Sequence, residues 1–214
     1  MDILITSIIS ILTIVTSAYI TQNTNKKTIR ANIQTKTNIE WIDQIRKISA
    51  ELIYNYELII SSAKFSYGNK VAIAVNEAEI ENQINTALNS GILNGYPQAQ
   101  KEALLKSKKG HDETYNESVA TASLLTNQLL LYFIDEKKDA YIVEMIMGLR
   151  SVNSRIADFS RIQVEVGEDM SYYHEKTDEF LSISGELDSA INEFRNAIAS
   201  YLKVEWENVK KENR

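Results

Sequence analysis

The chain has 214 residues and a net charge of −6, with 44% hydrophobic and 24% charged residues. These values are ordinary for a globular protein, and the acidic balance means that no nucleic-acid partner is expected. There is no cysteine, which removes any disulfide framework. Seven glycines and one proline leave few places where a helix has to break.

The first element is an uncharged stretch at residues 3–20 that contains neither Gly nor Pro. As an α-helix it would span about 27 Å, close to the thickness of a hydrocarbon core. Only Asp2 precedes it, whereas four basic residues follow it ahead of any acid: Lys26, Lys27, Arg30 and Lys36. This asymmetry predicts a single-pass cell-membrane anchor with the N-terminus outside and the remaining chain in the cytoplasm. The basic cluster is also expected to attract anionic lipid headgroups.

A cleaved signal peptide is the alternative interpretation of this stretch. Small residues at Thr16-Ser17-Ala18 would suit a signal peptidase. A secretory signal begins with a positively charged segment, however, and here the only residue between Met1 and the apolar run is the acid Asp2. The sequence therefore favours an anchor that is retained.

Hydroxyl side chains form a stripe along one face of the predicted anchor, at spacings of four, three and four: Thr6, Ser10, Thr13 and Ser17. Small residues in such a stripe allow helices to approach closely and to form hydrogen bonds with one another, which predicts self-association in the lipid bilayer. Two alternatives remain open. Each hydroxyl could instead bond to its own helix in a monomeric anchor, or the stripe could line a water-filled pore.

Beyond the anchor, apolar residues recur every three or four positions, and no segment alternates with period two. We expect an all-α protein in which residues 1–22 form the transmembrane anchor, 23–28 a juxtamembrane linker and 29–214 a cytoplasmic bundle. The bundle is expected to be antiparallel, with about four long helices. They are predicted at residues 29–65, from about 111 to 133, from about 139 to 166, and through 180–201, with 71–90 as a shorter addition.

Two predicted interruptions set these boundaries. Ser66-Tyr67-Gly68-Asn69 is expected to end the first cytoplasmic helix, and residues 91–112 are expected to form a loop. Four lysines lie within that loop: Lys101, Lys106, Lys108 and Lys109. They could contact phosphate, but no aromatic platform or phosphate-binding motif accompanies them, so a solvated loop is the preferred interpretation.

The sequence carries no catalytic signature, and we expect neither enzymatic activity nor a metal or cofactor. Its two histidines, His111 and His174, lack the spacing of metal ligands, and no phosphate-binding glycine loop or nucleophile elbow occurs. His174 is expected to be a partly buried cap on the bundle. Acidic residues near 165–175 lack the pattern of a calcium loop and are expected to form a solvated turn.

Residues 30–47 resemble the juxtamembrane signature of a family of uncharacterised small bacterial and prophage proteins. In that family an N-terminal membrane helix precedes a stretch similar to R-A-D-I-x-S-K-x-R-I-E-W-I-x-x-V-R. Asn32 and Asn38 stand here in place of an acid and a base. Residues 125–133 and 201–210 resemble the family's leucine-rich helix and its C-terminal ending. The resemblance implies a membrane helix with a cytoplasmic helical domain, transfers no activity, and prompts a hypothesis of a role in phage defence.

Trp41 and Arg46 have two interpretations. An indole at this position usually covers the end of a bundle core, and this is the favoured one. The alternative is a docking surface for a lipid headgroup or for a membrane-associated protein. Together, these features predict a membrane-anchored interaction protein that acts as a scaffold, sensor or effector at the inner leaflet. Its expected partners are further copies of the same chain in a homo-oligomer, or another membrane-associated protein. A membrane-perturbing or pore-forming effector is the alternative function.

Overall fold

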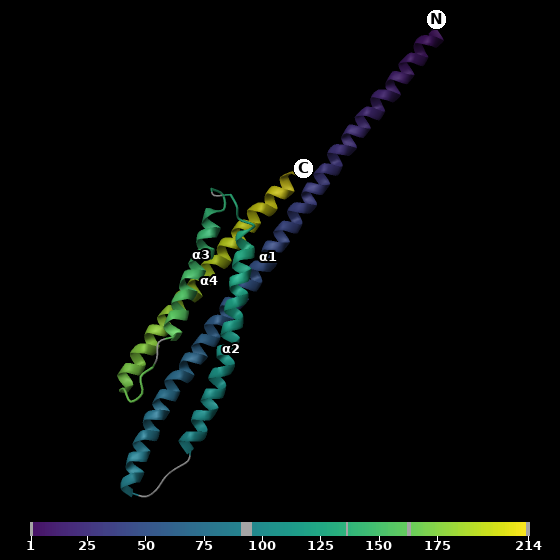
Figure 1. The fold of residues 1–214 in the computed structure, drawn as a ribbon. Helices are drawn as coiled ribbons and strands as arrows, with labels where there is room; N and C mark the ends of the chain where they lie inside the picture. The colour runs from purple at the N-terminus through teal and green to yellow at the C-terminus, as the bar shows by residue number, and fades with distance from the viewer. Residues whose placement is uncertain (1, 91–95, 136, 162–163, 213–214) are drawn as a thin grey trace. The chain divides into compact units, whose positions relative to one another are not determined.

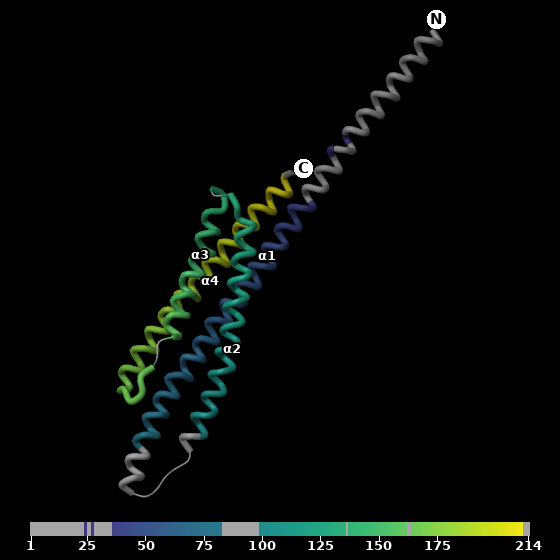
Figure 2. Tube along the Cα trace, in the orientation of Figure 1, coloured from purple at the N-terminus to yellow at the C-terminus, as the bar shows by residue number. Residues whose placement is uncertain are grey.

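Four long helices make up the computed structural model: α1 (Asp2–Ser90), α2 (Tyr96–Leu130), α3 (Ala140–Arg161) and α4 (Met170–Glu212) (Figures 1 and 2). The structure describes the backbone of residues 2–90, 96–135, 137–161 and 164–212. It describes the side chains of residues 24, 27, 36–82, 99–135, 137–161 and 164–211. Within these residues there is no strand, and the predicted all-α bundle of four helices is confirmed.

The chain divides into two compact units. One comprises Met1–Gln44 together with Tyr201–Arg214, and the other comprises Ile45–Ser200. Within the Ile45–Ser200 unit, consecutive helices run in alternating directions, so this part of the bundle is antiparallel, as the sequence predicts (Figure 1).

The core of the Ile45–Ser200 unit consists of the apolar side chains that the three-and-four spacing predicts. Each fully buried aliphatic or Phe side chain contributes roughly 1.5–3 kcal/mol relative to an exposed one. Nine of them have no exposed surface: Ile45, Leu52, Ile59, Leu129, Ile146, Leu149, Ile156, Leu187 and Phe194. All four helices therefore contribute to one apolar core.

The predicted end of the first cytoplasmic helix at residues 66–69 is wrong, because α1 continues through it to Ser90. A glycine inside a helix costs about 1 kcal/mol relative to Ala, and Gly68 is the only glycine in this segment. Next to it, Tyr67 is buried and its ring stacks on Phe180 with 4.6 Å between ring centroids. This packing offsets the preference of a single glycine for a helix end.

The predicted loop at residues 91–112 is also wrong over most of its length, because α2 begins at Tyr96. Pro97 is the second residue of α2, within the first turn, where a helix leaves backbone N–H groups unpaired in any case. Gly110 lies inside α2. Two ion pairs at i,i+4 spacing span this position and support the helix: Lys108–Asp112 and Lys109–Glu113.

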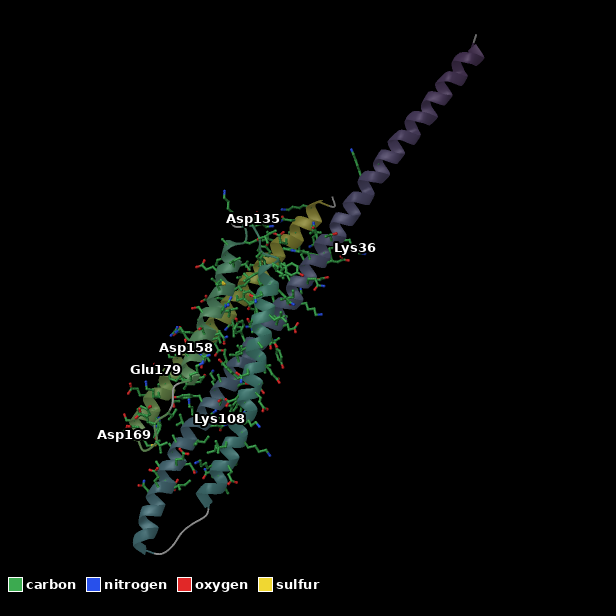
Figure 3. The ribbon with its side chains drawn as sticks, in the orientation of Figure 1. Lys36, Lys108, Asp135, Asp158, Asp169 and Glu179 are labelled. Carbon is green, nitrogen blue, oxygen red and sulfur yellow. The ribbon has the colours of Figure 1, made fainter. Side chains whose placement is uncertain are left out.

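Aspartates shape the connections on either side of α3 (Figure 3). Asp135 accepts hydrogen bonds at 3.0 Å from the backbone N–H groups of Lys137 and Lys138, and these bonds lower the pKa of its carboxyl group. Asp169 accepts one at 2.9 Å from the N–H of Tyr172 in the first turn of α4. The helix end predicted near residue 166 is wrong, because α3 already ends at Arg161.

Candidate functional site

A cavity of about 270 Å³ lies in the Ile45–Ser200 unit, among α1, α2 and α3. Its wall mixes polar and apolar surface, and three helices provide its polar side chains: Tyr67 and Lys70 from α1, Lys108, Asp112 and Tyr115 from α2, and Ser160 from α3. The three α2 residues follow one another at spacings of four and three, which places them on one face of that helix.

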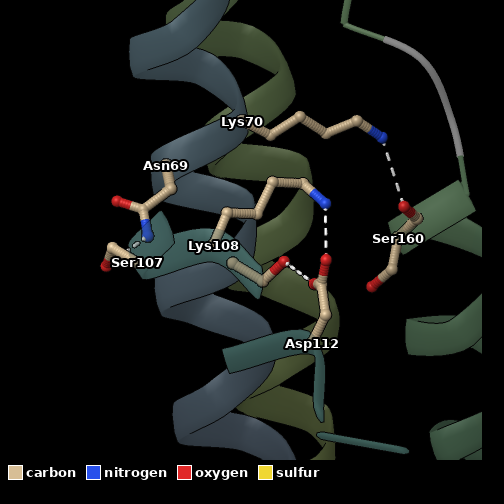
Figure 4. Close-up of polar contacts among 7 residues, drawn as sticks. Asn69, Lys70, Ser107, Lys108, Asp112 and Ser160 are labelled. Carbon is tan, nitrogen blue, oxygen red and sulfur yellow. Dashed lines mark hydrogen bonds and ion pairs between the residues drawn. The ribbon is translucent and has the colours of Figure 1, made fainter. Parts of the chain in front are cut away.

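Basic groups outnumber acidic ones in this wall. Lys70, Lys108 and Arg161 line the cavity, whereas Asp112 is its one acidic residue. The Lys108 Nζ donates to Asp112 Oδ2 at 2.6 Å, and the Ser66 hydroxyl donates to the other oxygen of the same carboxylate. The Lys70 Nζ donates to the backbone oxygen of Ser160 at 3.2 Å. Figure 4 shows that the side chains of Lys70 and Lys108 extend in the same direction.

The surroundings of Lys70 affect the pKa of its ammonium group. Burial lowers the pKa of Lys70, and the positive charge of Lys108 lowers it further. Asp112 acts in the opposite direction, but its effect is smaller than that of Lys108. The environment of Lys70 is therefore one in which an added negative charge would be stabilising.

Three hydroxyl groups in the wall are buried and lack any hydrogen-bond partner: those of Tyr67, Tyr115 and Ser160. Burial raises the pKa of Tyr67 to about 12 and also raises that of Tyr115, so both phenols keep their protons at neutral pH. A buried polar group without a partner costs roughly 1–3 kcal/mol. Each of these oxygens has less than 1 Å² of accessible surface, so none of them directly contacts the space of the cavity.

Aromatic rings hold Tyr67 in place. Its ring lies 4.6 Å from that of Phe180 and 5.4 Å from that of Phe159, measured between centroids. Phe159 and Phe180 are themselves 5.5 Å apart and buried. Contacts of this kind contribute about 0.5–1.5 kcal/mol per pair beyond the burial of area, so the phenol is a fixed part of the wall.

The site residues predicted from the sequence lie elsewhere. Lys27 and Lys36 are exposed, and Lys36 pairs with Glu40 at 3.8 Å. Trp41 is half-buried, with its ring centroid 6.2 Å from that of Tyr201, and Arg46 is exposed. The other predicted side chains lie outside the described residues: Thr6, Ser10, Thr13, Ser17, Lys26 and Arg30.

The lysine-rich segment is not the solvated loop that the sequence predicts. Lys108 lines the cavity, and Lys101 forms an ion pair with Glu77 at 2.6 Å. Lys106 and Lys109 are exposed, as expected of solvated lysines. The spacing of Lys108, Asp112 and Tyr115 could have indicated the cavity. These residues share one face only if the segment is a helix, and the sequence analysis expected a loop.

The expected role of His174 as a partly buried cap is wrong, because its side chain is exposed. The neighbouring Tyr173 is buried instead, and its hydroxyl donates to the backbone oxygen of Glu165 at 2.9 Å. His111 stacks on Phe65 with 4.9 Å between ring centroids. Where the structure describes side chains, no group of three or more His, Asp or Glu residues is placed to hold a metal ion.

The described residues include no helix that is long and apolar enough to cross a membrane, and the side chains of residues 3–20 are not among them. No family model, curated protein or solved structure matches the chain.

Proposed function

We propose that this protein is a membrane-anchored helical interaction protein, in which a cytoplasmic bundle acts at the inner leaflet as a scaffold, sensor or effector. The observation that carries the proposal is the uncharged stretch at residues 3–20, followed by a basic cluster before the first acid beyond it. That stretch belongs to α1, the helix that also supplies Ile45, Leu52 and Ile59 to the core of the bundle. One helix, α1, therefore contains both the proposed anchor and part of the core of the bundle.

Self-association in the membrane is part of this proposal. The hydroxyl stripe at Thr6, Ser10, Thr13 and Ser17 suits close contact between copies of the anchor. The same stripe supports a second candidate function, a membrane-perturbing effector whose anchors assemble into a lesion or pore. The resemblance to prophage proteins adds the hypothesis that the role of the protein is in phage defence.

The absence of cysteine makes the predicted orientation directly testable. Single cysteines introduced by Asp2→Cys and Lys211→Cys would be treated, in intact cells, with a maleimide that does not cross membranes. We expect labelling at position 2 without permeabilisation and at position 211 only after it. Labelling of both positions in intact cells, or recovery of the protein in the soluble fraction, would contradict the proposed anchor.

A variant of the hydroxyl stripe separates the two candidate functions. In the full chain, Thr6, Ser10, Thr13 and Ser17 would together be replaced by Leu, which keeps the stretch apolar but removes the small polar face. An interaction protein is expected to remain in the membrane and to cause no dye leakage from liposomes with or without the change. Leakage that the wild-type chain causes and the variant abolishes would favour the membrane-perturbing effector.

A further inference from the structure

We propose that the cavity among α1, α2 and α3 binds a small phosphorylated ligand, with Lys70, Lys108 and Arg161 as its cationic contacts. This site does not depend on the membrane anchor, and it goes beyond the function proposed above. The phosphate group could belong to a soluble compound or to a lipid headgroup, because both present the same chemistry to the cavity.

The charge of the wall is the first step of the argument. Three cations and one carboxylate line the cavity, and that carboxylate is already bound by Lys108 and Ser66. Arg161 also pairs with Asp158 at 3.2 Å, an exposed contact of a kind that contributes little. An anion entering the cavity meets net positive charge in a site that is partly shielded from water, where such attraction is stronger than at a free surface.

The size of the charge is the second step. The side chains of the lining carry three positive charges and one negative charge, a net charge of +2. A phosphate monoester carries about −1.5 to −2 at pH 7, more than the single charge of a carboxylate, so it compensates the wall more completely. Hydrogen bonds from Lys and Arg to such a charged acceptor are the stronger kind.

The positions of the cations favour phosphate over carboxylate. A carboxylate offers two oxygens in one plane, whereas a phosphate monoester offers three terminal oxygens directed to different sides. Lys70, Lys108 and Arg161 come from three different helices around the space and so match the tetrahedral group better. A volume of about 270 Å³ lies just below the usual range for ligand sites, about 300–1,000 Å³, which suits a small phosphorylated compound or a headgroup rather than a nucleotide-sized one.

The test is a calorimetric titration of the full-length protein, in a non-ionic detergent, with inorganic phosphate. Lys108→Gln removes a cation from the cavity, and Lys109→Gln removes the same charge from an exposed neighbour that does not line it. We expect saturable binding that weakens by about tenfold or more in Lys108→Gln, and by less than about twofold in Lys109→Gln. No saturable binding, or equal weakening by both changes, would overturn the proposal.

A second variant protects the test against a loss of folding. Lys70→Gln removes a different cation of the cavity and leaves the Lys108–Asp112 pair intact. We expect this variant to bind phosphate more weakly, by about tenfold or more, the effect of losing one hydrogen bond between charged groups. A Lys70→Gln variant that folds normally by circular dichroism and binds phosphate as tightly as the wild type would contradict the role given to the cations.

The source of the phosphate group is resolved by two further probes in the same titration. Glycerol 3-phosphate represents a soluble ester, and short-chain phosphatidic acid in mixed micelles represents a lipid headgroup. Tighter binding of the first than of the second, with the same response to Lys108→Gln, identifies a soluble ligand, and the reverse order identifies a lipid. If Lys108→Gln and Lys109→Gln affect both probes equally, the attraction is general and the site is refuted.

Discussion

At the scale of single residues, the spacing of leucines along α2 decides which of them support the fold. Leu125 and Leu129 are buried, whereas Leu124 is 58% exposed. The adjacent leucines at 124–125 and 129–131 would predict a wider apolar face, which the exposure of Leu124 contradicts. A run of leucines specifies the helix but does not by itself determine which face the other helices will cover.

These two environments give a direct prediction for stability. Leu129→Ala removes a fully buried side chain and is expected to lower the free energy of unfolding by about 2–5 kcal/mol, the range for a Leu-to-Ala change in a core. Leu124→Ala makes the same chemical change on an exposed face and should alter it by less than about 0.5 kcal/mol. Denaturant unfolding followed by circular dichroism measures both values. Similar losses in the two variants would contradict the described core.

Asp135 predicts a dependence of stability on pH. Its carboxylate accepts two backbone hydrogen bonds, so its pKa in the folded protein lies below the ordinary value of 3.8. A carboxylate with a depressed pKa contributes its full stabilisation at pH values above its ordinary pKa of 3.8. This stabilisation is lost as the pH falls through the pKa of the folded state. Asp135→Asn should therefore be less stable than wild type at pH 7, and the difference should narrow below pH 3.8. A difference that is constant with pH would show that the charge contributes nothing.

At the scale of elements, the sequence predicts helices better than it predicts their ends. Apolar spacing identified all four helices, because burial of a regular stripe dominates the stability of each. It failed at residues 66–69 and 91–112, where local signals such as Gly68 and Gly110 suggested a break. In both segments, contacts with other parts of the chain or ion pairs along the helix outweigh a preference of about 1 kcal/mol.

Two glycines in different conformations test this balance. Gly68 lies within α1, and a Cβ added there would meet no atom within 4 Å, so Gly68→Ala should raise the free energy of unfolding by about 0.5–1 kcal/mol. Gly167 has a φ of +84°, a conformation that L-residues rarely adopt. Gly167→Ala should therefore lower the free energy of unfolding by about 1 kcal/mol or more. Thermal unfolding of the two variants beside wild type checks the opposite signs.

At the scale of the whole molecule, the cavity shows what sequence reasoning could not reach. Its residues lie between positions 63 and 161 and belong to three helices, so no local pattern connects them. Lys108 was noted as a lysine able to contact phosphate, but the expectation of a loop removed the helical face that places it beside Asp112 and Tyr115. Tyr67 and Ser160 carried no signal at all, because an unpartnered hydroxyl is a property of packing rather than of sequence.

Both tryptophans of the chain, Trp41 and Trp206, belong to the unit formed by Met1–Gln44 and Tyr201–Arg214, so indole fluorescence reports on that unit alone. Circular dichroism reports on the helices of both units. Because α1 and α4 pass from one unit to the other without a helix break, we expect both signals to change at the same denaturant concentration. Separate midpoints would contradict this expectation. They would mean that one unit unfolds while the other stays folded, and that indole fluorescence detects the unfolding of the unit that contains both tryptophans.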